Sequence, residues 1–151
     1  MSIIPPPFLS LQPISGSFPF QAKFIPIQGN MRVVLGSQVD PQHRSRRAAP
    51  TNGYFAPIPS STTGAAIVPL SLDSRHAEAW ISNNMLYIRD LGTGYGTFVN
   101  GARLEGPYAL KRGDILKLGV EIPRNANTPP YIADEELKPI LARISFSGVS
   151  N

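Results

Sequence analysis

Residues 72–119 constrain the fold more than any other part of the chain. Short runs of apolar and β-branched residues alternate there with turn signals, including the dipeptides Asn100-Gly101 and Arg112-Gly113. Asn-Gly between two such runs is the strongest local signal for a tight β-hairpin. Many short strands with frequent turns are typical of two packed sheets. The sequence therefore predicts an all-β sandwich of two antiparallel sheets.

The composition agrees with one loop-rich domain. Of 151 residues, 16 are Pro, 13 are Gly and 42% are hydrophobic, which is enough for one core joined by long turns. The chain contains no cysteine, which excludes disulfides and cysteine-based zinc sites. We expect no metal and no cofactor. A net charge of +4 and a pI of about 9.7 favour acidic partners.

The distribution of Pro, Gly and Ser divides the chain. Residues 1–17 are rich in Pro and Ser, and we expect them to form a disordered N-terminal segment. The domain is predicted over 18–147, followed by a tail at 148–151. Inside the domain, residues 36–66 are basic and rich in Pro, Ser and Thr, which predicts a long loop with one short strand at Tyr54-Phe55.

Alternating apolar and polar residues locate the other elements. We predict strands over 18–27, 31–35, 78–81, 86–89, 97–99, 109–110, 114–118 and 141–146, and one helical turn over 134–137. Large side chains at alternate strand positions are expected to face the core, and we place there Trp80, Tyr87, Phe98 and Leu118.

Four short anchors stand in a fixed order along this part of the chain: Arg75-His76-Ala77, Asp90-Leu91, Gly96 to Gly101, and Gly113-Asp114. Their order and spacing resemble the forkhead-associated (FHA) domain, a β-sandwich that binds phosphothreonine peptides. The resemblance covers residues 18–146 and is most specific over 72–119. It implies a non-enzymatic module that recognises a phosphorylated protein or peptide, with no small-molecule substrate.

A phosphate group needs a cation, preferably a guanidinium, together with hydroxyl and backbone donors. FHA domains place that arginine directly after a glycine at the end of an early strand. In this chain Gly36 is followed by Ser37. The resemblance therefore implies that the main phosphate ligand is missing, unless another arginine replaces it. The nearest candidates in the sequence are Arg32, Arg44, Arg46 and Arg47.

The second ligand segment also departs from the family. Asp73 stands three residues before His76, where the family has serine. A carboxylate at this place would repel a phosphate. A shift of one residue would instead place Ser74 there, with Arg75 beside it. The family role implied for His76 is structural, because it braces the loop from inside.

The third ligand segment follows Asp90-Leu91. Thr93 fits a family hydroxyl position, and Tyr95 stands where the family has an asparagine that holds the peptide main chain. The resemblance thus gives a full set of site residues. The predicted phosphopeptide-binding residues are Ser37, Asp73, Ser74, Arg75, Thr93, Tyr95 and Asn100, and the predicted structural residues are Gly36, His76, Gly96 and Thr97.

The residues that support the loops match the family pattern, whereas several of the residues that would bind the phosphate differ from it. This leaves two predictions open: binding of phosphothreonine through a substitute cation, or binding that is weak or independent of phosphate. The segments 52–55, 74–80 and 118–122 are similar to fungal FHA proteins of the cytoplasm-to-vacuole targeting and sarcolemmal membrane-associated type. That resemblance implies a striatin-type phosphatase–kinase complex as partner. We expect a cytoplasmic location, with a nuclear or membrane-peripheral one as alternatives, and no membrane span.

Other function classes are weaker. A basic run at 43–47 offers nucleic-acid binding through the 36–66 loop as the alternative function, although no aromatic stacking set accompanies it. Ser74, His76 and Asp73 supply the residue types of a hydrolase, but they are too close in sequence for correct placement. The glycine-rich segment 92–96 precedes a predicted strand, whereas a nucleotide-binding loop opens a helix.

Overall fold

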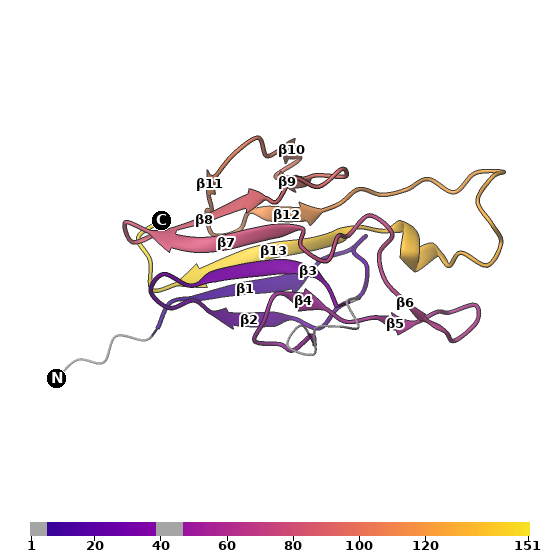
Figure 1. Cartoon of the computed structure of the whole chain (residues 1–151), viewed down its shortest axis with the longest axis horizontal. Helices are drawn as coiled ribbons and strands as arrows, with labels where there is room; N and C mark the ends of the chain where they lie inside the picture. The colour runs from indigo at the N-terminus through magenta and orange to yellow at the C-terminus, as the bar shows by residue number, and fades with distance from the viewer. Residues whose placement is uncertain (1–5, 39–46) are drawn as a thin grey trace.

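The structure is a computed structural model that describes residues 6–38 and 47–151 (Figure 1). Its strands are β1 (Phe8–Pro13), β2 (Lys23–Pro26), β3 (Arg32–Ser37), β4 (Tyr54–Phe55), β5 (Ile58–Pro59), β6 (Ala66–Ile67), β7 (Ala77–Ser82), β8 (Met85–Asp90), β9 (Thr97–Val99), β10 (Ala102–Arg103), β11 (Tyr108–Ala109), β12 (Ile115–Leu118) and β13 (Ile140–Ser147). A 3-10 turn, η2 (Asp134–Leu137), precedes β13 at the place where the sequence predicts a helical turn. Within the described ranges, no helix is long and apolar enough to cross a bilayer.

These strands form two packed sheets. The six-stranded sheet has the order β10-β9-β12-β13-β1-β2, and the five-stranded sheet has the order β11-β8-β7-β3-β4. A separate ribbon of β5 and β6 extends from the same end of the molecule as the long connection between β12 and η2 (Figure 1). The predicted β-sandwich is confirmed. One pairing differs from the expectation of purely antiparallel sheets, because β3 and β4 run parallel.

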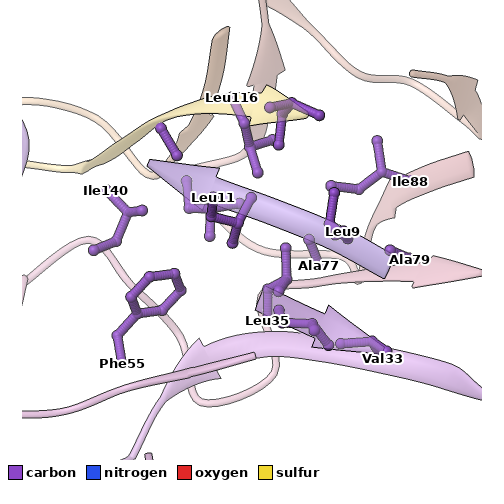
Figure 2. Packing of buried hydrophobic residues seen from close by; sticks show 14 of the residues in the cluster. Leu9, Leu11, Val33, Leu35, Phe55, Ala77, Ala79, Ile88, Leu116 and Ile140 are labelled. Carbon is purple, nitrogen blue, oxygen red and sulfur yellow. The ribbon is translucent and has the colours of Figure 1, made fainter. Parts of the chain in front are cut away.

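The core lies between the sheets and is built from alternate strand positions. Leu9 and Leu11 of β1 face Leu35 of β3, and all three side chains are fully buried (Figure 2). The opposite positions of the same strands face outward. Alternation of this kind is what a sheet with one buried face requires.

Strand β1 corrects the prediction that residues 1–17 are disordered. It pairs with β13 on one side and β2 on the other, so it lies inside the six-stranded sheet. The prolines that suggested disorder stand at its ends, at Pro7 and Pro13, where they remove few ladder hydrogen bonds. Between them Leu9 and Leu11 alternate with polar residues and enter the core.

Two tight hairpins join neighbouring strands, and the second lies at the Asn100-Gly101 turn that the sequence predicts. In the β7–β8 turn, Asn83 and Asn84 have φ values of 50° and 61°. In the β9–β10 turn, Asn100 and Gly101 have φ values of 51° and 85°. Positive φ at both central residues defines the type I′ turn, which matches the twist of the flanking strands. These turns fix the register of both pairs.

The expected core positions of the aromatic residues are wrong for three of four. Leu118 is fully buried, whereas Trp80, Tyr87 and Phe98 are only half-buried and lie on the outer faces of the sheets. In β7 the inward residues are instead Ala77 and Ala79. Alternation places residues on two faces without saying which one is buried, and here the smaller side chains of β7 face inward.

The 36–66 segment is more ordered than the single predicted strand suggests. Besides β4, its described part contains β5 and the first residue of β6.

The 148–151 tail is also packed against the domain, because Ser150 N donates to Asn84 O and the Asn151 side chain donates to Leu110 O.

Lys23 of β2 connects the described part of the 36–66 segment to the six-stranded sheet. The residue is 4% exposed; its ammonium donates to Ala49 O at 2.9 Å and Tyr54 O at 2.6 Å and lies 5.0 Å from the centroid of the Phe55 ring. Burial lowers the pKa of Lys23 from 10.5 to about 8. The buried charge is therefore held by carbonyl oxygens and an aromatic face instead of by a carboxylate.

A pH dependence of stability follows from Lys23. Below pH 8 the folded and unfolded states are both protonated, and the cost of burying the charge applies in full. Between pH 8 and 10.5 the unfolded chain keeps its proton while the folded chain releases it, so stability rises with pH, by up to about 3 kcal/mol. Urea unfolding across this range should show the rise in the wild type but not in Lys23→Met. Equal pH profiles for the two proteins would contradict it.

Candidate functional site

Three loops meet at the end of the sandwich where β3 and β8 finish and β7 and β9 begin. Gly36 joins two of them, because a Cβ added there would lie 2.2 Å from Ser74 O and 2.8 Å from Asp73 O. Ser37 N donates to Asp73 O at 3.0 Å. Only glycine permits this close approach of the two backbones, which explains the structural role predicted for Gly36.

His76 joins the second loop to the third. It is fully buried; its Nδ1 accepts a hydrogen bond from Asp73 N at 3.1 Å, and its Nε2 donates to Gly96 O at 2.7 Å. These two bonds define the tautomer with the proton on Nε2. The ring thus lies between the 73–76 loop and the 92–96 loop, as the bracing role implied.

Asp90, at the end of β8, organises the third loop. One carboxylate oxygen accepts from Thr93 Oγ1 at 2.7 Å and Thr97 Oγ1 at 2.8 Å, and the other accepts from Gly92 N and Thr93 N. Burial alone would raise the pKa of Asp90, but the hydrogen bonds from Thr93, Thr97 and Gly92 outweigh it and lower the pKa below its usual value. The sequence marked Asp90 as an anchor without revealing this role.

Two predicted ligand residues have hydroxyl groups that are not available at the surface of this arrangement. Thr93 Oγ1 donates its proton to Asp90 and accepts from Gly96 N at 2.9 Å. Ser37 is 3% exposed, and among the described residues its hydroxyl has no hydrogen-bond partner. Both hydroxyls therefore belong to the interior of the loop end and not to its surface.

Asn100 does not belong to the site. It lies in the β9–β10 turn, at the opposite end of β9 from the 92–96 loop. Its Nδ2 donates to Asp114 Oδ1 at 2.9 Å, and its Oδ1 accepts from Ile115 N at 2.9 Å. The Asn100 side chain therefore connects the β9–β10 turn to the turn that precedes β12. The resemblance implied a ligand role for Asn100 but could not give the direction in which its side chain points.

Four predicted ligand residues remain at the surface of the loop end. Asp73, Arg75 and Tyr95 are exposed, and Ser74 is half-buried. Within the described part of the chain, Arg75 has no hydrogen bond or ion pair. The contacts of Asp73 to His76 and Ser37 use backbone atoms, which leaves its carboxylate at the surface. The 73–76 loop therefore presents one anionic and one cationic side chain, separated by Ser74.

Two further arginines lie near these loops. Arg103 of β10 extends over Gly96, and its Nη2 lies 3.5 Å from Thr93 O and 3.4 Å from Gly94 O. Arg47 is exposed, and the next residue, Ala48, donates to the Gln38 side chain at 2.7 Å, one residue beyond Ser37. A tight turn at Asn100-Gly101 pairs Arg103 with Phe98, and this pairing could have indicated from the sequence that Arg103 lies near the 92–96 loop.

The predicted substitute cations Arg44 and Arg46, with the rest of the basic run 43–46, lie outside the described residues. Nucleic-acid binding by that loop therefore stays an untested prediction. The hydrolase alternative is contradicted, since both nitrogens of the His76 ring are engaged and the ring is fully buried. The glycine-rich 92–96 segment leads into strand β9 and not into a helix.

Comparison with known families agrees with this geometry. Residues 66–119, which contain the second and third loops, match the family model of the FHA domain. The sandwich and its loop end are those of this class, and the chain contains an FHA domain.

Two relatives come from Schizosaccharomyces pombe. The chain is 42% identical over 53 residues to the probable E3 ubiquitin-protein ligase dma1, covering 31% of this chain and 20% of that protein. It is 39% identical over 80 residues to an uncharacterized protein, covering 48% of this chain and 26% of the relative. The chain thus spans about a quarter or less of the relatives that it matches.

The chain is also similar to solved FHA structures at low sequence identity. An FHA domain of an Arabidopsis thaliana protein superposes with a TM-score of 0.50 at 18% identity, over 97% of this chain and 89% of that one. The yeast Dun1 FHA domain, solved with a doubly phosphorylated peptide, gives a TM-score of 0.45 at 17% identity, over 96% and 77% of the two chains.

Proposed function

We propose that this chain is a non-enzymatic recognition module that binds a phosphothreonine-containing protein segment at its loop end, with Arg75 as the principal cation. The observation that carries the proposal is the exposed Arg75 side chain, which lies on the 73–76 loop that His76 and Gly36 hold in place. Arginine is the side chain best suited to bind a phosphate through two hydrogen bonds.

Rigidity of the surrounding loops supports this assignment. Asp90 and His76 fix the 92–96 and 73–76 loops through six hydrogen bonds, so the cation and the backbone donors need little ordering when a ligand arrives. Phospho-motif recognition commonly uses arginine on loops held by a rigid scaffold. In this proposal Arg47 and Arg103 are the candidates for a second cation that binds the phosphate beside Arg75.

The same geometry predicts a weaker site than one with the full family set. Ser37 replaces the family arginine, the Thr93 proton is used internally, and Asp73 places a negative charge next to Arg75. The fungal subfamily, a striatin-type complex as partner and a cytoplasmic location remain proposals from the sequence.

The test compares a phosphothreonine peptide library with its unphosphorylated counterpart by fluorescence anisotropy. Arg75→Glu should weaken binding of the phosphorylated peptides by roughly tenfold or more, because a charge-assisted bond is lost and a repulsion is added. Arg143→Glu is the matched control, since Arg143 is exposed on β13, within the six-stranded sheet, and the change in net charge is the same. Equal losses in the two variants would refute the placement of the site.

Asp73→Ser should strengthen phosphopeptide binding by about fivefold. The substitution removes a negative charge from the loop that carries Arg75, and for exposed charges in water this is worth about 1 kcal/mol. It leaves the loop intact, because the contacts of Asp73 to His76 and Ser37 use only backbone atoms. Anisotropy titrations at low and high salt measure the gain, which should shrink with added salt. No gain at low salt would mean that Asp73 does not face the ligand.

A further inference from the structure

The outer face of the five-stranded sheet carries a cluster of aromatic and charged side chains that the loop end does not use. Trp80 of β7 stacks on Tyr87 of β8, with ring centroids 5.8 Å apart and planes 19° apart. The Arg32 guanidinium of β3 lies 4.5 Å from the Trp80 ring, and that of Arg89 of β8 lies 5.9 Å from it. Glu78 lies beside them on β7.

Glu78 holds the two arginines in place. Its side chain is 7% exposed; its Oε1 accepts from Arg32 Nη1 at 2.9 Å and from Arg89 Nε at 2.8 Å, and Arg89 Nη2 lies 2.7 Å from the same oxygen. The side chains of Arg32 and Arg89 are 50% and 47% exposed. Each guanidinium has five donors, and within the described part of the chain Glu78 is the only hydrogen-bond partner of either one. The cluster keeps a net positive charge.

A hollow lies next to Arg32 on the same sheet. Its volume is about 180 Å³, and its walls include Met31, Val34 and Tyr54. Met31 is 47% exposed although its side chain is apolar. The hollow is smaller than the roughly 300–1,000 Å³ of pockets for cofactors and drug-sized ligands, and it suits one apolar side chain of a partner.

From these contacts we infer that the outer face of β3, β7 and β8 is a second docking surface, for an acidic protein segment that places an apolar side chain in the hollow beside Arg32. Trp, Tyr and Arg are the residues enriched at the energetic centres of protein interfaces. Charge complementarity selects carboxylates, which two exposed and pre-oriented guanidiniums can bind in pairs. A nucleic acid fits less well, because the Glu78 carboxylate lies between the two cations.

Trp80 reports on this surface directly, since it is the only tryptophan of the chain. The probe is a pool of short peptides with a fixed leucine flanked by Asp and Glu at varied positions, and its binding is followed by tryptophan fluorescence. We expect a saturable change in emission that weakens with salt. Arg32→Gln should weaken the interaction about tenfold. Its fold is preserved because Arg89 still pairs with Glu78.

Two controls separate this surface from general charge effects and from the loop end. Arg143→Gln makes the same change in charge on a strand of the other sheet and should leave the titration unchanged, as should Arg75→Glu at the loop end. Three results would overturn the inference: no saturable change up to millimolar peptide, an equal loss in Arg143→Gln, or an equally tight response to a single-stranded oligonucleotide.

Discussion

Gly36→Ala is expected to destabilise the domain by about 3 kcal/mol or more and to abolish recognition at the loop end. The added Cβ would lie 2.2 Å from Ser74 O and 2.6 Å from the Ser74 carbonyl carbon, and backbone atoms cannot yield as a flexible side chain does. The 73–76 loop would have to move away from β3, carrying Arg75 with it. Overpacking of this kind typically costs 1–3 kcal/mol, and more where the backbone is rigid.

Urea denaturation and peptide anisotropy measure the two effects of Gly36→Ala separately. Gly106→Ala is the matched control: no atom lies within 4 Å of its added Cβ. That variant should remain within about 0.5 kcal/mol of the wild type, because a glycine in open space at an ordinary φ accepts a methyl group. If Gly36→Ala behaves like Gly106→Ala, the close contact between β3 and the 73–76 loop does not exist in solution.

Asp90→Ala is the second change with a large expected effect, a loss of about 2–4 kcal/mol. It removes the acceptor of four hydrogen bonds and leaves the fully buried Thr97 hydroxyl without its partner. The 92–96 loop then loses its order, and phosphopeptide binding should fall with it. Thermal unfolding and anisotropy report the two losses.

The control for this change is Asp134→Ala. Asp134 pairs with Arg124 at 2.9 Å, but its side chain is 78% exposed, and such pairs contribute little to stability. It should change the free energy of unfolding by less than about 0.5 kcal/mol. Equal effects of the two substitutions would contradict the role of Asp90 in the loop.

Asp90 also sets a pH dependence in the acid range. The folded pKa of Asp90 is lower than that of the unfolded chain, so the unfolded state binds more protons in the window between the two pKa values. The contribution of Asp90 to stability is complete above the unfolded pKa and is lost as the pH falls through the folded one. The stability difference between wild type and Asp90→Ala should therefore narrow in acid.

The fold could be predicted from local signals that have one structural meaning. Asn100-Gly101 and Asn83-Asn84 adopt positive φ at low cost, and each turn then fixes the register of the two strands beside it. β1 was missed for the opposite reason. Its prolines signal disorder by composition, and only the pairing of Leu9 and Leu11 with two distant strands shows that they end a strand instead of preventing one.

Which face of each sheet is buried could not be predicted, because an alternating pattern is the same whichever set of residues points inward. Glu78 and Trp80 alternate with Ala77 and Ala79, and residue size alone suggested the wrong inward set. The large residues lie on the outer face, where Glu78 pairs with Arg32 of β3 and Arg89 of β8. Contacts between strands distant in sequence leave no local signal.

The site was predicted at the level of loops but not of side-chain atoms. Sequence order correctly gathers Gly36, His76 and Gly96 at one end of the sandwich. It does not reveal that the Thr93 proton is used by Asp90, or that Asn100 points to Asp114 at the far end of β9. In both cases the side chain forms a hydrogen bond with a partner several residues away in the sequence, and the sequence alone does not identify that partner.

The measurement that tests the central claim most directly is a titration with one phosphothreonine peptide library and its unphosphorylated counterpart, using the wild-type chain and Arg75→Glu. The account predicts phosphate-dependent binding by the wild type that falls roughly tenfold or more in the variant. Equal binding of the two libraries by the wild type would contradict phosphothreonine recognition. The sandwich would then act through a phosphate-independent surface, and the Trp80 face could be tested independently of that result.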